Sequence, residues 1–241
     1  MFKASKFEYK FRFVLHLVIF ALGFFAPWDR ALHLDPGGAN AHVWGVGAVW
    51  LSRWMNTMAA FEVLLIVGII FAIVSALLRV SGAAYLGYGV VQSLGMHGEA
   101  VVADGPYRHV RNPLYLGTWI HSLALALLMP PSGAVFTVVM IGLLQLRLML
   151  AEESFLAAKL GQPYAEYCAR VPRWFPSIVP RVAGSGAQPR WAQAVLGEMY
   201  MVLVALAFAT LGWRYNEFLL TQCVLVALGV SLVVRSVLPR R

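Results

Sequence analysis

Residues 104–117, DGPYRHVRNPLYLG, carry the densest polar chemistry of an otherwise apolar chain. Asn112 is a good N-cap residue and Pro113 fits the first turn of a helix, so a helix is expected to begin here. The positive end of that helix, beside Arg111, would form an anion-binding site. Two tyrosines flank this site and can stack on a ligand or donate hydrogen bonds to it: Tyr107 and Tyr115.

A second polar cluster contains two adjacent carboxylates, Glu152 and Glu153, followed by GQPYAEYCARVPRWFP at residues 161–176. Successive residues of a helix point about 100° apart, so one carboxylate can face a pocket while the other caps the helix or pairs with a neighbouring arginine. A buried carboxylate without a partner is costly, which makes a cationic ligand the natural partner of the pocket-facing one. The alternative is a solvated helix start whose acidic residues are favoured by the helix dipole.

The elements that must position these clusters are two apolar segments, 114–129 and 133–150, separated only by Met129-Pro130-Pro131-Ser132. Two prolines between apolar helices predict a tight helix hairpin. Such a hairpin returns the chain to the side from which it came. We therefore expect both polar clusters to meet at one mouth of the helix pair.

The composition indicates an integral membrane protein, because 60% of the residues are hydrophobic and only 12% are charged, whereas soluble domains carry roughly 25% charged residues. The net charge of +8 is scattered among apolar segments, which argues against a nucleic-acid-binding face. Neither Cys168 nor Cys223 belongs to a CxxC pair, and no HxxxH or HExxH spacing occurs, so no disulfide framework or metal site is expected. His16 and His121 lie on apolar segments and are expected to pack or to bond between helices.

The predicted fold is all-α and polytopic, with about six transmembrane helices around the central hairpin. The candidate spans are 12–27, 61–78, 114–129, 133–150, 194–213 and 217–234.

The apolar segment Ser81–Gly95 could be a short span, a re-entrant piece or an interfacial segment. If it stays on the side of the N-terminus, all but three of the 19 Lys and Arg share one face, which predicts that both termini are cytoplasmic. The organisation expected is an N-terminal transmembrane pair with a Trp-rich outer interfacial loop (1–80), a catalytic core with the hairpin (81–193) and a C-terminal transmembrane pair (194–241).

The two clusters and the hairpin between them resemble the isoprenylcysteine carboxyl methyltransferase family, which is close to the phospholipid methyltransferases. The similarity covers GPYRHVRNPLYLG, the paired glutamates and GQPYAEYCARVPRWFP, in the family's order and spacing, over residues 90–180. One position departs from the family pattern R-H-P: the family's histidine is Asn112 here.

The resemblance implies S-adenosylmethionine as methyl donor, held without a Rossmann fold in a pocket at the cytoplasmic membrane surface. Glu152 would meet its ammonium or sulfonium charge, and the helix start at Asn112 would receive its carboxylate. By position, the implied cofactor contacts are Gln92, Glu99, Ala100, Val101, Val102, Tyr107, Asn112, Pro113, Leu114, Tyr115 and Glu152. The expected catalytic residues are Arg111, Asn112, Tyr115 and Glu152.

The implied substrate is a lipophilic or prenylated molecule that enters from the bilayer. Substrate contacts in the family involve an arginine one turn before the glutamates, and Arg147 lies one position from that register; Arg111 and Arg173 are further candidates. A carboxylate nucleophile needs no base, whereas an amine must lose a proton. Because Asn112 cannot accept that proton, a carboxylate acceptor is favoured and a phospholipid amine comes next.

Two other functions fit parts of the sequence. Membrane sterol-type reductases share a related helical arrangement and a tyrosine-rich motif but use NADPH, and the glutamate pair argues against a cofactor with several phosphates. A transporter or sensor would favour acidic residues inside several spans. The acidic residues of the other spans lie near span ends instead: Glu62, Glu198 and Glu217.

Overall fold

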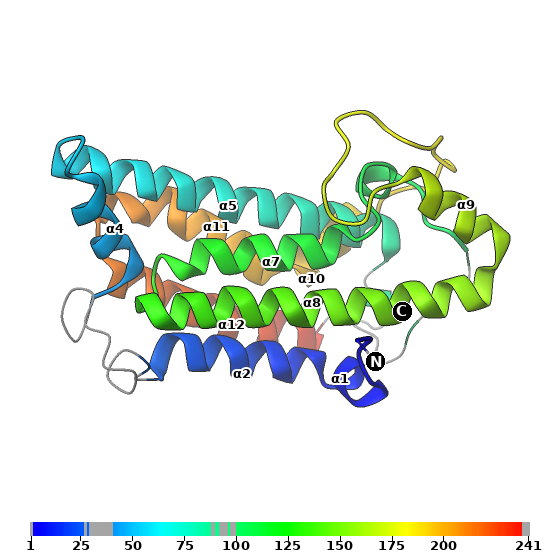
Figure 1. Ribbon diagram of the computed structural model, residues 1–241, viewed down its shortest axis with the longest axis horizontal. Coiled ribbons are helices and arrows are strands. Elements are labelled where there is room, and N and C mark those ends of the chain that lie inside the picture. The colour runs from blue at the N-terminus through cyan, green and yellow to red at the C-terminus, as the bar shows by residue number, and fades with distance from the viewer. Residues whose placement is uncertain are drawn as a thin grey trace.

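The computed structural model describes residues 2–26, 28, 41–87, 90–91, 96 and 100–237, and within them the chain is helical with no strands. Figure 1 shows the long helices side by side in an elongated bundle. The predicted all-α class is confirmed. The helices are α1 (Lys6–Lys10), α2 (Arg12–Phe25), α4 (Val43–Leu51), α5 (Thr57–Leu86), η1 (Gly105–Arg108), α7 (Pro113–Ala126), α8 (Pro131–Leu160), α9 (Gln162–Arg170), α10 (Trp191–Gly197), α11 (Met199–Leu211), η2 (Gly212–Arg214) and α12 (Glu217–Val237).

Three helices of the described chain, α5, α8 and α12, are long and apolar enough to cross a membrane by themselves. The pair α10 and α11, bent by 74°, counts as a fourth if it forms one broken span. By contrast α2 and α7 have 14 residues each, or about 21 Å, against a hydrocarbon thickness of about 30 Å. The membrane class is supported, and the predicted count of six spans is not confirmed.

Helix α5 is longer than its apolar pattern indicates, since it continues past Arg79 to Leu86. Arg79 does not end the helix because Glu198 holds its guanidinium with contacts of 2.7 and 2.9 Å, Nη2 to Oε1 and Nε to Oε2. Residues 81–86 are therefore the last turns of α5 rather than the start of a separate segment. Helix α5 also crosses the predicted domain boundary at residue 80, and the division into three parts stays a prediction.

The central hairpin is confirmed: α7 and α8 pack against each other, and Pro131 occupies the first turn of α8. The predicted end of the second helix at residue 150 is wrong, because α8 runs on to Leu160 and ends at Gly161, whose φ is 60°. Its 30 residues span about 45 Å, so its last turns reach beyond a hydrocarbon core of about 30 Å. Both glutamates thus lie inside a helix and not at its end.

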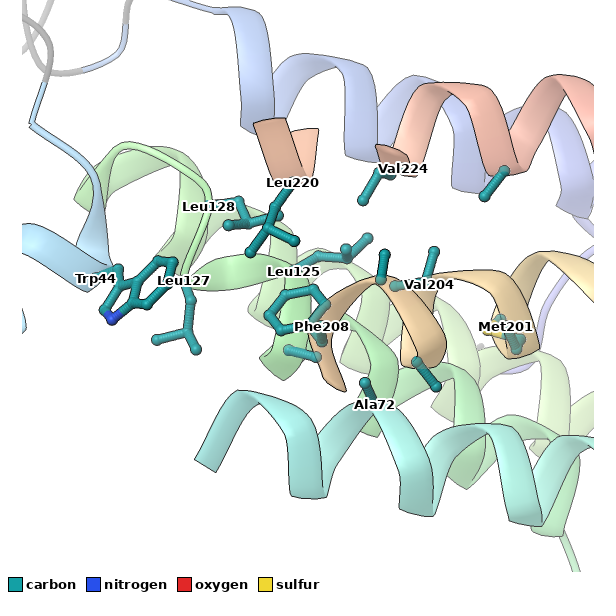
Figure 2. Close-up of a cluster of buried hydrophobic side chains, with 14 of the residues drawn as sticks. Trp44, Ala72, Leu125, Leu127, Leu128, Met201, Val204, Phe208, Leu220 and Val224 are labelled. Carbon is teal, nitrogen blue, oxygen red and sulfur yellow. The ribbon is translucent and has the colours of Figure 1, made fainter. Parts of the chain in front are cut away.

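The apolar core lies where α4, α5, α7, α11 and α12 meet, around Trp44, Leu125, Phe208 and Leu220 (Figure 2). Trp44 is 2% exposed, and its Nε1 donates a hydrogen bond to the carbonyl of Phe61 at 3.1 Å. The prediction that the tryptophans of the 28–56 segment line the outer interface is wrong for Trp44. This indole packs inward because α4 folds back onto α5.

Helices α2 and α8 approach each other most closely at two glycines. A Cβ on Gly133 would lie 2.0 Å from the carbonyl oxygen of Gly23, and a Cβ on Gly23 would lie 1.9 Å from the hydroxyl of Thr137. Small residues of this kind let helix backbones pack tightly in membranes. The contact holds the N-terminal helix against the hairpin.

We expect Gly133→Ala to lower the free energy of unfolding by about 1–3 kcal/mol, because the added methyl group meets backbone that cannot rotate away. The measurement is denaturant or thermal unfolding in detergent. Gly229→Ala on α12 is the matched control, since nothing lies within 4 Å of a Cβ built there, and the better helix former should be neutral or stabilising. Equal stability of the two variants would contradict the close contact.

Candidate functional site

A cavity of about 340 Å³ lies between the end of α5, the start of α7, the last turns of α8, and α9. Figure 1 shows these segments together at one end of the bundle. The volume is in the range of small-molecule sites, about 300–1,000 Å³. The predicted residues that line it are Ala100, Val101, Val102, Tyr107, Arg111, Asn112, Pro113, Leu114, Tyr115 and Glu152.

The structure therefore brings together residues that the sequence places in two separate clusters. Gln92 and Glu99, the two remaining predicted cofactor contacts, lie outside the described residues. Their roles, like the cofactor roles of the lining residues, stay predictions.

The two adjacent glutamates of α8 have different surroundings. Glu153 is 8% exposed and accepts hydrogen bonds from Arg173 (Nη2 at 2.8 Å and Nε at 3.0 Å to Oε2), Arg111 (Nη1 at 3.3 Å) and Asn112 (Nδ2 at 2.9 Å). Glu152 lines the cavity and accepts a hydrogen bond of 2.6 Å from the hydroxyl of Tyr115. The prediction that one carboxylate faces a pocket while its neighbour pairs with arginine is confirmed.

Asn112 occupies the N-cap position of α7, but its side chain caps nothing. The prediction of a side-chain cap is wrong, because the amide of Asn112 is turned to the Glu153 carboxylate, and a hydrogen bond to a charged acceptor is stronger than one to a neutral group. The first backbone N–H groups of α7 consequently have no side-chain cap. Such groups are available to an anionic ligand.

Arg111 lines the cavity and is held from two directions. Its backbone N–H donates to the carbonyl of Pro172 at 2.9 Å, and its Nη1 contacts Glu153. Its Nε is buried and has no hydrogen-bond partner. Arg111 therefore contributes a cationic group to the cavity wall, and part of its charge is paired with Glu153.

The sequence interpretation missed part of the lining, including Tyr164 and Tyr167 of α9. The hydroxyl of Tyr167 donates to the carbonyl of Tyr107 at 2.8 Å. Burial raises the pKa of Tyr164 and of Tyr167 above its usual range, and burial together with the charge of Glu152 raises the pKa of Tyr107. These phenols stay protonated at neutral pH and can donate hydrogen bonds or stack, but they cannot act as bases.

Helical spacing could have found several of the missed residues. Leu156 and Leu160 follow Glu152 at intervals of four and therefore share its face of α8. Tyr164 and Tyr167 are three residues apart on α9. The other missed lining residues are Leu86 and Val90, which follow Arg79 and which the expected end of α5 excluded.

Neither of the other predicted substrate arginines lines the cavity. Arg147 is bound by Glu8 of α1, with Nη2 at 2.8 Å and Nε at 2.9 Å, and by the carbonyls of Phe2 and Lys3. Arg173 is bound by Glu153, and this contact raises the pKa of its guanidinium. A substrate role for these two arginines stays a prediction.

Residues 63–163 match the family described as phospholipid methyltransferase. Over this segment the chain is similar to that family, which is one of membrane S-adenosylmethionine-dependent methyltransferases. The resemblance read from the two polar clusters is thereby confirmed at the level of the family. Comparison of the chain with curated proteins and with solved structures finds no match.

The matching segment runs from α5 to the start of α9 and includes the hairpin and both glutamates. The family indicates a methyltransferase of the membrane. Helices α1 and α2 and helices α10 to α12 lie outside it. Among the described residues, no group of three or more His, Cys, Asp or Glu is placed to hold a metal ion.

The contact between Glu8 and Arg147 predicts a pH dependence of the N-terminal segment. Hydrogen bonds from Arg147 and the backbone of Ser5 lower the pKa of Glu8 to about 2, against 4.5 ordinarily. A depressed pKa stabilises the folded contact above the unfolded value, and the stabilisation is lost as the pH falls from about 4.5 toward 2. The protection of residues 4–10 against hydrogen exchange, relative to the intrinsic rate at each pH, should therefore fall across this window.

In Glu8→Gln the same residues should exchange rapidly already at neutral pH, with little further change on acidification. A wild-type segment whose protection is constant from pH 5 to pH 2.5 would contradict this assignment.

Proposed function

We propose that the protein is an S-adenosylmethionine-dependent methyltransferase that methylates a lipophilic acceptor at the membrane surface. The observation that carries the proposal is the division of the two glutamates. Glu153 forms salt bridges with Arg111 and Arg173. Glu152 faces the cavity and accepts a hydrogen bond from the hydroxyl of Tyr115. A carboxylate placed in this way suits a cationic ligand.

The residues of the cavity fit such a cofactor at both of its charged ends. Glu152 suits an ammonium or sulfonium group. The guanidinium of Arg111 and the uncapped start of α7 suit a carboxylate. The aromatic walls offered by Tyr107, Tyr164 and Tyr167 suit a flat ring such as adenine.

S-adenosylmethionine would supply an electrophilic methyl group, whose bond to sulfur breaks with its electron pair left on sulfur as the acceptor's lone pair forms the new bond. The protein's part is to hold the two reactants in line and to keep water out. Tyr115 orients Glu152 through their 2.6 Å hydrogen bond. The apolar side chains of Leu156 and Leu160 close the same wall of the cavity.

Two acceptor chemistries suit this site. Asn112 in place of the family's histidine favours the carboxylate of a prenylated or isoprenoid-like molecule, which needs no base. The family name favours a phospholipid amine. For an amine, Glu152 offers a carboxylate at the cavity that could take the proton which Asn112 cannot accept.

We further propose a multi-pass arrangement with the cavity and both termini on the cytoplasmic side. In Figure 1, α1 lies in the same half of the bundle as α9, and α12 runs toward that half. The excess of Lys and Arg in the segments at this end supports the same orientation.

An NADPH-dependent reductase fits the cavity less well. Arg111 is the one Lys or Arg among the described residues that line it, and part of its charge is already paired with Glu153. A cofactor with several phosphates requires more cationic groups.

Glu152→Gln should weaken the binding of S-adenosylmethionine by roughly 10- to 100-fold, because a charge-assisted contact contributes about 1.5–3 kcal/mol. Isothermal titration calorimetry of the purified protein measures this. Thermal stability should change less than in a variant of Glu153, since Glu153, and not Glu152, is salt-bridged to Arg111 and Arg173 among the described residues. A Glu152→Gln variant with wild-type affinity would refute the assignment of Glu152, and absence of binding to the wild-type protein at millimolar cofactor would refute the proposed function.

Two further variants distinguish a residue that binds the cofactor from one that stabilises the fold. Glu153→Gln should lower the unfolding temperature, because it leaves Arg111 and Arg173 without their carboxylate. Glu166→Gln, on the exposed face of α9, removes the same charge and should alter neither stability nor affinity.

A further inference from the structure

The segment between α9 and α10 presents exposed apolar side chains although it is not part of a helix. Phe175 is 87% exposed, Ile178 98% and Val179 58%. They belong to residues 174–179, WFPSIV, which we call the apolar loop. Contact of such side chains with water is unfavourable, and several of them within a few residues indicate an interaction surface.

The apolar loop is held in place by hydrogen bonds to the residues of η1 and those just after it. The N–H of Ser177 donates to the carbonyl of His109 at 2.9 Å, and the ring Nδ1 of His109 contacts the carbonyl of Ser177 at 2.7 Å. After the loop, the N–H of Arg181 donates to the carbonyl of Arg108 at 2.9 Å. The fold therefore fixes the backbone of the loop while its large apolar side chains point away from the protein.

The charges around the apolar loop are all positive. Residues 167–190 contain four arginines and no aspartate or glutamate. Arg173 is bound to Glu153, whereas the other three are exposed: Arg170, Arg181 and Arg190. Exposed cations beside exposed apolar side chains match the two layers of a membrane surface, anionic head groups above and acyl chains below.

The segment that contains the loop rejoins the bundle near the level where α5 leaves the lipid. Leu77 of α5 is 64% exposed, as expected of a residue that faces lipid. Ala84 lies about 10 Å further along the same helix, and its carbonyl accepts a hydrogen bond of 2.9 Å from the N–H of Arg190. The next residue, Trp191, has an exposed indole, and tryptophan is enriched at membrane interfaces. Figure 1 shows the segment between α9 and α10 arching out from the side of the bundle, where a bilayer would surround it.

We propose that the apolar loop lies in the membrane leaflet at the cavity end of the bundle and binds an anionic lipid surface there. Phe175, Ile178 and Val179 lie among the upper parts of the acyl chains. Arg170 and Arg181 contact the anionic head groups. A second copy of the chain fits this surface less well, because a symmetric contact would bring the same arginines face to face.

This inference goes beyond the proposed function, since it requires neither a methyl donor nor an acceptor. It also connects the membrane surface with the cavity. Arg173, directly before the loop, is bound to Glu153, and the carbonyl of Pro172 accepts from the N–H of Arg111. The segment that holds these two cavity contacts is thereby attached to the lipid surface.

The first test places an environment-sensitive fluorophore on the loop of the full-length protein in nanodiscs. Ile178→Cys is labelled with NBD in a background that carries Cys168→Ala and Cys223→Ala. Emission should shift to shorter wavelength, and phospholipids brominated in their acyl chains should quench it. Because Ile178 is almost fully exposed, the substitution should not affect folding.

Glu166→Cys, labelled in the same background, is the matched control, since Glu166 is exposed on α9. Its emission should be quenched by aqueous iodide and not by the brominated lipids. Equal iodide quenching at positions 178 and 166 would overturn the proposal. Short-wavelength emission at position 178 without quenching by brominated lipids would also overturn it, because protein, such as a second copy of the chain, would then cover the loop.

The second test measures the preference for anionic lipids with the same label at position 178. Brominated phosphatidylglycerol should quench roughly two- to fivefold more than brominated phosphatidylcholine, because one basic residue at an anionic surface contributes a factor of about five at most. Arg170→Gln combined with Arg181→Gln should bring this ratio close to one. Arg214→Gln is the control, since Arg214 is exposed beside the start of α5, at the opposite end of the bundle. Equal quenching by the two lipids without these substitutions would overturn the role of the arginines.

Discussion

The candidate site depends on the neutralisation of one carboxylate, Glu153. Three donors from two other segments converge on it: Arg111 and Asn112 at the start of α7 and Arg173 after α9. Removing one partner of such a buried cluster leaves an uncompensated charge, so the cluster is stable only when all of its members are present. The same cluster holds the start of α7 against α8 and leaves Glu152, one position earlier, facing the cavity.

A second ion pair, between Arg79 and Glu198, lies deeper in the helix bundle than the Glu153 cluster. The contact between Arg79 and Glu198 is almost fully buried, with side-chain exposures of 12% and 1%. It allows α5 to continue through a charged residue, and this brings Leu86 and Val90 to the cavity. It also joins the family segment to α10 and α11, which lie outside that segment. The buried ion pair therefore positions residues that line the cavity.

The predictions from sequence succeeded where the signal was local. Asn112 and Pro113 located the helix start, the paired prolines located the hairpin, and helical geometry alone indicated that the two glutamates point in different directions. The predictions failed where a distant residue decides. The side chain of Asn112 leaves the helix end because Glu153 attracts it, and α8 continues beyond residue 150 because arginines neutralise that glutamate. Trp44 packs into the core because α4 folds back onto α5.

The sequence by itself determined the membrane class, the hairpin, the resemblance to a family and most of the residues around the cavity, because each rests on composition or on motifs of short spacing. Only the tertiary structure decided that Arg147 turns to Glu8 rather than to the cavity. Only the tertiary structure placed His16 against Gln145 and left one amide oxygen without a partner. The physical reason is that pairing of buried polar groups is settled by which side chains meet across helices, and no local pattern in the chain records that choice.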